Sequence, residues 1–62
     1  MKLKIKEFRE EKGLSQTALS KRSGVSRQTI NGLENENIKV TTTDTLIKIA
    51  DALDKKVSDI FL

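Results

Sequence analysis

The sequence contains no cysteine, no histidine, no proline, no tryptophan and no tyrosine. Without cysteine there is no disulfide and no thiolate metal site, and without histidine there is no His-based catalytic triad and no ordinary zinc site. A glycine-rich phosphate loop is also absent, and the acids Glu7, Glu10 and Glu11 lie along one predicted helix with lysines nearby instead of converging as a pair. We therefore expect no enzymatic activity, no cofactor, no metal and no small-molecule substrate.

Long apolar segments are missing as well. No apolar run approaches the roughly 20 residues that cross a bilayer, and no signal-peptide-like apolar segment follows the first residues, so we expect no membrane contact and a cytoplasmic protein. The 62 residues, 34% charged and 35% hydrophobic, suit one folded domain over residues 1–62 with a single small core. A helical bundle with short connections is the economical arrangement at this length.

The net charge of +3 is unevenly distributed. Residues 1–27 contain eight Lys and Arg against three acids, a net charge of +5, whereas residues 28–62 contain four against six, a net charge of −2. A basic half fits an anionic partner. For any single lysine, a solvated surface position remains the alternative.

The segment over residues 15–34 predicts two short helices joined by a tight turn. Ser15 and Ser26 stand where helix N-caps are expected, because a serine oxygen can accept a hydrogen bond from a backbone N–H of the first turn. Gly24 lies between them and can take a positive φ, which lets the first helix end and the chain turn sharply. We predict helices over residues 16–22 and 27–34.

The second of these helices has only one apolar pair, Ile30 and Leu33. The opposite face is rich in amides and free of bulky apolar groups, with Arg27 on its flank. Such a stripe is what a helix offers to base edges in the major groove of duplex DNA. The stripe comprises Gln28, Asn31, Gly32 and Asn35.

The motif LSQTALSKRSGVSRQTINGLE, preceded by IKEFREEKG and followed by TLIKIADAL and VSDIF, resembles the helix-turn-helix of the Cro/cI-like (XRE) family of DNA-binding domains. The resemblance extends from Ile5 to Phe61. It implies an all-α, five-helix, lambda-repressor-like domain with the helix-turn-helix at helices two and three. It also implies sequence-specific binding of double-stranded DNA by a transcriptional regulator, most often a repressor, that acts as a homodimer on a pseudo-palindromic operator.

Candidate DNA contacts follow from the stripe and from the resemblance. Gln28 is the strongest base reader, since its amide can be bidentate to adenine, whereas Arg27 could contact guanine or phosphate. The alternatives are an ordinary first-turn polar residue for Gln16, a structural role for Thr29 and a neutral glycine at Gly32. The predicted base contacts are Arg27, Gln28, Asn31 and Gly32; the predicted phosphate contacts are Ser15, Gln16, Ser26, Thr29, Asn35 and Lys39.

A structural ion pair between Arg9 and Glu34 is implied by the resemblance, in which these positions fix the recognition helix against the first helix. Gln16 is implied to brace the recognition helix in the same way. The alternative for the ion pair is an exposed contact worth ~0–1 kcal/mol.

The remaining helices follow from apolar spacing. The first helix should begin at Lys2 or Leu3 and end at Lys12 before Gly13. A helix capped by Thr42 or Thr43 should bury one stripe of side chains, Leu46, Ile49, Ala50 and Leu53, and a short last helix should span residues 58–61.

Two departures from the family pattern stand out. Residues 35–43 contain neither the usual glycine nor the usual proline, and Asp54 occupies a position where the family often has glycine. The alternative function is a protein-interaction module on the same fold, such as an antitoxin or adaptor, in which an apolar edge would bind the partner. That edge comprises Ile60, Phe61 and Leu62.

Overall fold

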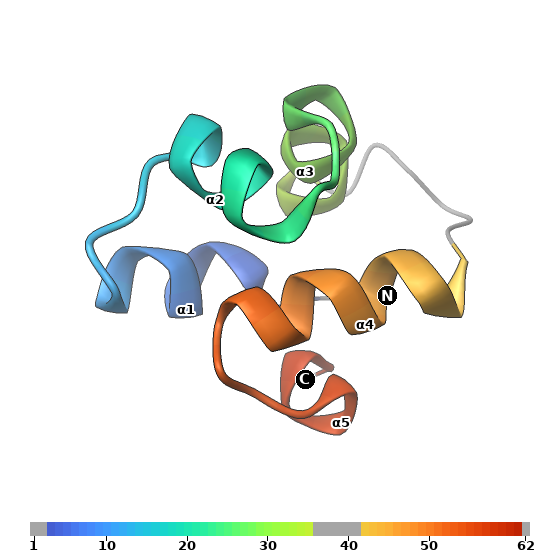
Figure 1. Cartoon of the computed structure of the whole chain (residues 1–62). Coiled ribbons are helices and arrows are strands. Elements are labelled where there is room, and N and C mark those ends of the chain that lie inside the picture. The colour runs from blue at the N-terminus through green and yellow to red at the C-terminus, as the bar shows by residue number, and fades with distance from the viewer. Residues whose placement is uncertain (1–2, 36–41, 62) are drawn as a thin grey trace.

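The computed structural model describes residues 3–35 and 42–61. Five helices form in these residues, and their bounds are α1 (Ile5–Glu11), α2 (Gln16–Ser23), α3 (Arg27–Glu34), α4 (Thr43–Ala52) and α5 (Val57–Ile60). Helices α2 and α3 lie on one side of the molecule, α1 and α4 lie beneath them, and α5 lies at the opposite end (Figure 1). The all-α, five-helix prediction is therefore confirmed.

The helix-turn-helix begins and turns where the serines and the glycine predict. The Ser15 Oγ accepts a hydrogen bond from the Ala18 backbone N–H at 3.0 Å, and the Ser26 Oγ accepts one from the Thr29 N–H at 3.2 Å. Gly24 ends α2 with φ of 78°, a left-handed conformation that strains residues with a Cβ. The chain can therefore reverse within three residues and place α3 beside α2.

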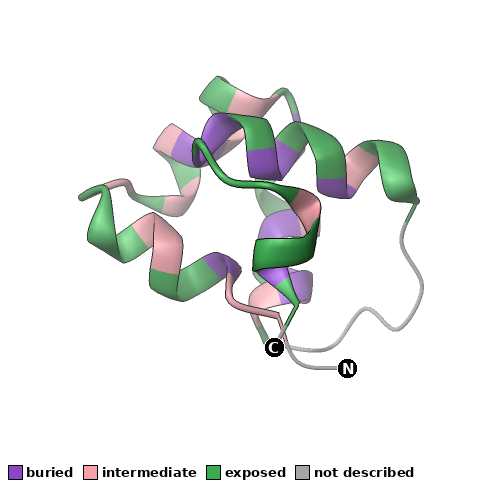
Figure 2. Ribbon diagram, turned by 90° about the horizontal axis from the view of Figure 1, so that it is seen from below, coloured by how far each residue is buried: buried purple, intermediate pink, exposed green. Residues whose placement is uncertain are grey.

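The core lies between α4 and the other helices, and buried positions recur along the helices on their inner sides (Figure 2). The predicted α4 stripe is buried as expected, whereas Val25 and Ala52 join the core without having been predicted. Ile30 and Leu33 fix α3 to the body of the domain and leave the rest of that helix available for binding. The core residues are Ile5, Leu19, Val25, Ile30, Leu33, Ile49, Ala50, Ala52, Leu53 and Ile60.

The start of the first helix and the end of the last helix differ from the prediction for a common reason. The first helix begins at Ile5 and not at Lys2 or Leu3, and the last helix spans Val57–Ile60 and not residues 58–61. Leu3 and Phe61 form an isolated antiparallel β-bridge, and the Lys4 N–H donates to the Ile60 carbonyl at 2.7 Å. Because this backbone pairing occupies both ends of the described chain, neither segment is helical there.

Asp54 adopts the left-handed conformation, with φ of 57°, at the position where glycine is usual in the family. Its carboxylate accepts a hydrogen bond from the Lys12 ammonium at 2.7 Å, and Arg22 lies 3.9 Å away. These cations lower the pKa of Asp54, chiefly through the Lys12 hydrogen bond. Asp54 therefore connects the end of α4 to α1 and α2.

Some predictions fall outside the described residues, namely those for Lys39 and Leu62 and most of the segment that departs from the family pattern. Within the described parts of the chain, none of the helices has the length and apolar character needed to cross a membrane.

Candidate nucleic-acid interface

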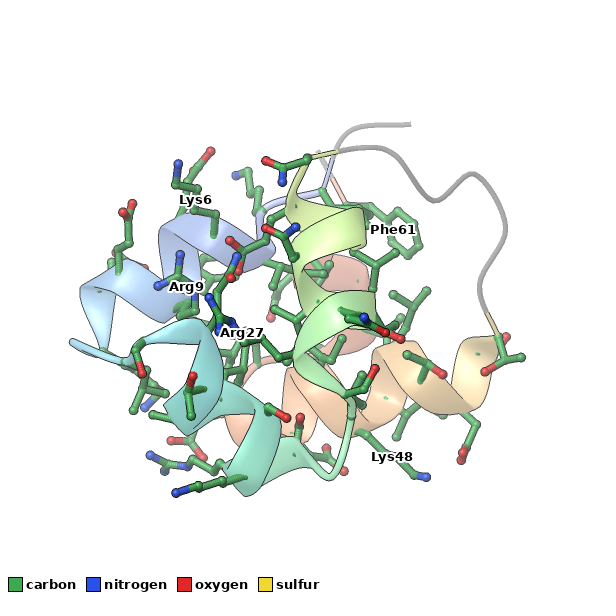
Figure 3. All side chains as sticks on the ribbon, turned by 90° about the horizontal axis from the view of Figure 1, so that it is seen from above. Lys6, Arg9, Arg27, Lys48 and Phe61 are labelled. Carbon is green, nitrogen blue, oxygen red and sulfur yellow. The ribbon has the colours of Figure 1, made fainter. Side chains whose placement is uncertain are left out.

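A surface hollow of about 230 Å³ lies between the start of α2 and the outer side of α3. Four of the predicted DNA-contacting residues line it, namely Gln16, Arg27, Gln28 and Asn31. Figure 3 looks onto this side of the molecule, with Arg27 between α2 and α3 and Arg9 on the α1 side. The fold therefore brings together side chains that are up to fifteen positions apart in the sequence.

Arg9 and Glu34 meet in a bidentate ion pair. The Arg9 Nε lies 2.7 Å from Glu34 Oε2, its Nη2 lies 3.0 Å from Oε1, and its Nη1 donates to the Leu14 carbonyl at 2.8 Å. The Arg9 side chain is 11% exposed and the Glu34 side chain 2% exposed. The hydrogen bond to Glu34 raises the pKa of Arg9, so the guanidinium keeps its charge, and the contact differs from an exposed surface pair.

Gln16 extends this contact from α2 to the outer side of α3. Its Nε2 donates to Glu34 Oε1 and to Asn31 Oδ1, both at 3.1 Å. Asn35 donates from Nδ2 to the same Asn31 oxygen at 3.0 Å. We call these five residues, Arg9, Gln16, Asn31, Glu34 and Asn35, the Glu34 network.

The amide contacts of the Glu34 network were not predicted from the sequence. Gln16 was expected to brace the recognition helix, but its bond to Asn31 and the bond from Asn35 to Asn31 were missed. Asn35 caps the end of α3 four residues after Asn31, and this spacing was a signal for the second bond. The first depends on how α2 and α3 cross, which local spacing does not determine.

The hydroxyl groups at the start of α3 form a local pair. Ser26 donates to Thr29 Oγ1 at 2.8 Å while accepting the Thr29 backbone N–H. The Ser26 proton is therefore occupied, and the Thr29 hydroxyl is the group that can donate to a phosphate. The Ser15 Oγ accepts the Ala18 N–H and makes no other hydrogen bond within the described residues, so the Ser15 hydroxyl proton is also available to a phosphate.

Gly32 does not belong to the exposed stripe. It is buried, together with Ile30 and Leu33, so the prediction that it lies on the outward face is wrong. Glycine has no side chain, so neighbouring side chains easily cover its backbone on the surface of a helix. A base contact by Gly32 stays a prediction.

The comparisons with known proteins agree with this geometry. A family model described as "Helix-turn-helix" matches residues 5–60. The chain belongs to this helix-turn-helix family. It is also similar to a protein of Archaeoglobus fulgidus described as an uncharacterized HTH-type transcriptional regulator, with 39% identity over 66 residues that cover 100% of this chain and 86% of the relative.

The resemblance to the XRE family of DNA-binding domains is thus confirmed. Membership supports DNA-binding regulation of transcription as the class of function of this helix-turn-helix protein. In such a domain α2 and α3 are the two helices of the motif, and the hollow lies between them.

Proposed function

We propose that this helix-turn-helix protein binds duplex DNA sequence-specifically, with α3 in the major groove, and that it represses transcription as a homodimer on a pseudo-palindromic operator. The observation that supports this best is the hollow lined by Gln16, Arg27, Gln28 and Asn31. Three amides and one guanidinium that converge on this hollow between α2 and α3 match the donor and acceptor pattern of base edges. The proposal is of a non-enzymatic protein that acts in the cytoplasm.

Gln28 and Arg27 are the two side chains of the hollow that are most available to bind DNA. Both are exposed, and neither makes a hydrogen bond to another described residue. Gln28 therefore keeps both an amide donor and an amide acceptor for adenine N7 and N6. Arg27 keeps its charge and its donors for guanine or for a phosphate at the groove edge.

Phosphate contacts would flank the groove. The free backbone N–H groups at the start of α2 favour an anion, and Ser15 and Gln16 lie at that end. The Thr29 hydroxyl and the Asn35 amide lie near the two ends of α3. Lys39 was predicted for the same role in the segment that follows.

We expect a homodimer because a single α3 helix is short. One module offers few base contacts, so useful affinity needs two modules on half-sites about one helical turn, ~34 Å, apart. We place the dimer surface at α5 and the segment before α4. Phe61, which is 38% exposed beside α5, is an apolar group available there.

The second candidate function is a protein-interaction module, and the exposure of Phe61 is the observation in its favour. Ile60, which was predicted for the same apolar edge, is fully buried and unavailable for a partner. The remaining apolar surface at this edge is therefore small among the described residues, and we rank this candidate second.

The test is selection from a labelled, partly randomised duplex pool at low and at near-physiological salt, with sequencing of the bound fraction. We expect a pseudo-palindrome to be enriched and its binding to survive the higher salt. Gln28→Ala should relax preference at one position in each half-site by ~1–3 kcal/mol, whereas Lys39→Ala should weaken all sequences alike. Binding that disappears with salt and enriches no sequence would refute the proposal and favour the second candidate.

A further inference from the structure

We propose that Asn31 presents only its amide nitrogen to the major groove, where it selects guanine, and that Gln16 fixes this orientation. This inference rests on the proposed function, because it assigns one base pair within the DNA site of α3. Gln16 is a positioning residue in this account, since it acts through Asn31.

The orientation follows from a chain of groups that begins with Arg9, which can only donate. Arg9 binds both oxygens of Glu34, whose carboxylate can only accept. The Gln16 atom 3.1 Å from Glu34 Oε1 must therefore be its amide nitrogen. That same nitrogen lies 3.1 Å from Asn31, so the Asn31 atom that faces it must be the oxygen.

The Asn31 oxygen is then fully occupied. It accepts from Gln16 at 3.1 Å and from Asn35 at 3.0 Å, and an amide oxygen has two lone pairs. The Asn31 nitrogen, with two N–H donors, is the part of the amide left for a base. Asn31 is exposed and lines the hollow, so this nitrogen can reach the groove.

A group with two donors and no free acceptor distinguishes the base pairs. Guanine presents two adjacent acceptors, O6 and N7, to the major groove, and a single lysine nitrogen binds both. Adenine presents one acceptor, N7, beside the N6 donor, and N6 would need the Asn31 oxygen that is already occupied. Thymine O4 is a second acceptor of the A·T pair, but the N6 donor separates it from N7, so only guanine offers two adjacent acceptors. The geometry of Asn31 therefore selects a G·C pair.

Gln28 lies in the same hollow without these restraints. It forms no hydrogen bond to another described residue, so its amide can turn either way and bind adenine bidentately. The two amides of α3 differ in specificity because only Asn31 is held by the Glu34 network.

The experiment is the same duplex selection with four proteins: wild type, Asn31→Ala, Gln16→Met and Gln28→Met. Asn31→Ala locates the base pair that Asn31 contacts, as the position that loses its preference. Gln16→Met removes the donor that holds Asn31 with little change in shape. Gln28→Met is the matched control, because it removes a glutamine amide from the same hollow without touching Asn31. Far-UV circular dichroism establishes that each variant is folded.

We expect the located position to be G·C in the wild type, with about tenfold preference over A·T. Gln16→Met should accept A·T there nearly as well as G·C, whereas Gln28→Met should keep G·C at that position and lose preference elsewhere. Three results would overturn the inference and leave the proposed function intact. The first is a wild-type preference for A·T at the located position, and the second is an unchanged G·C preference in folded Gln16→Met. The third is an Asn31→Ala variant that keeps its base preference at every position. Absence of any enriched sequence for the wild type would overturn both. If Gln16→Met does not fold, Asn35→Ala replaces it: this change frees one lone pair of the Asn31 oxygen while Gln16 still holds the amide, so the G·C preference should fall only in part, and an unchanged preference would overturn the inference.

Discussion

Replacing Arg9 with methionine should destabilise the domain far more than the loss of a surface ion pair would. Glu34 is 2% exposed, so Arg9→Met leaves a buried carboxylate with Gln16 as its remaining described side-chain donor. Removal of one partner from a buried pair costs ~3–5 kcal/mol, and the remaining Gln16 bond favours the lower end. For 62 residues the whole free energy of unfolding is about 3–9 kcal/mol. Arg9→Met should therefore lose at least a third of the stability.

The second change, Glu34→Met in the Arg9→Met background, separates the contribution of the ion pair to stability from the contribution of the packing of either side chain. It removes the unpaired carboxylate and should recover about 2 kcal/mol. Urea denaturation followed by far-UV circular dichroism suits a chain without tryptophan. If Arg9→Met costs under about 1 kcal/mol, or if the coupling between the two changes disappears in 1 M salt, as for an exposed pair, the pair is a surface contact and the reasoning is wrong.

Three further predictions concern the turns and caps. Ser26→Ala should cost ~1 kcal/mol in thermal melts, because it removes the N-cap of α3, and an unchanged melt would show that the cap is dispensable. Asp54→Gly should be more stable than Asp54→Ala by ~1 kcal/mol in urea denaturation, since both lose the carboxylate but only glycine is unstrained at φ of 57°. Because Lys12 and, more weakly, Arg22 lower the pKa of folded Asp54, this carboxylate stabilises the fold above its ordinary pKa, and the stabilisation is lost as pH falls through the lowered value. Lys12→Gln should thus be less stable than wild type at neutral pH and approach it in acid; a difference that stays constant with pH would contradict this.

The helix-turn-helix could be predicted from local chemistry because its signals are local. A serine oxygen satisfies an N–H three residues ahead, and Gly24 supplies the left-handed turn, so the bounds of α3 agree with the prediction. The ends of α1 and α5 could not be predicted in this way. They depend on a β-bridge between Leu3 and Phe61, at opposite ends of the described chain, and no local spacing indicates such a pairing.

The same distinction applies to the candidate site, where local spacing predicts some features and the assembled fold determines the others. Helical periodicity was enough to place Gln28 and Asn31 on one face with Arg27 at its flank, and the structure brings them together with Gln16. Periodicity failed for Gly32, which is buried, because the covering of a small residue depends on what packs against it. The acceptor role of the Asn31 oxygen depends on three helices at once and is visible only in the assembled fold.

The double variant Arg9→Met/Glu34→Met also tests whether the Glu34 network serves folding alone. Glu34 pairs with Arg9, and it also accepts from the Gln16 nitrogen that holds the Asn31 oxygen. Without Glu34, the Gln16 amide can rotate and offer its oxygen to Asn31, which frees the Asn31 oxygen for a base. The double variant should therefore recover part of the stability lost in Arg9→Met and still bind the selected operator, while its preference for G·C over A·T at the Asn31 position falls by several-fold in competition binding. If the folded double variant keeps the wild-type preference, the network stabilises the domain without influencing which base pair it selects.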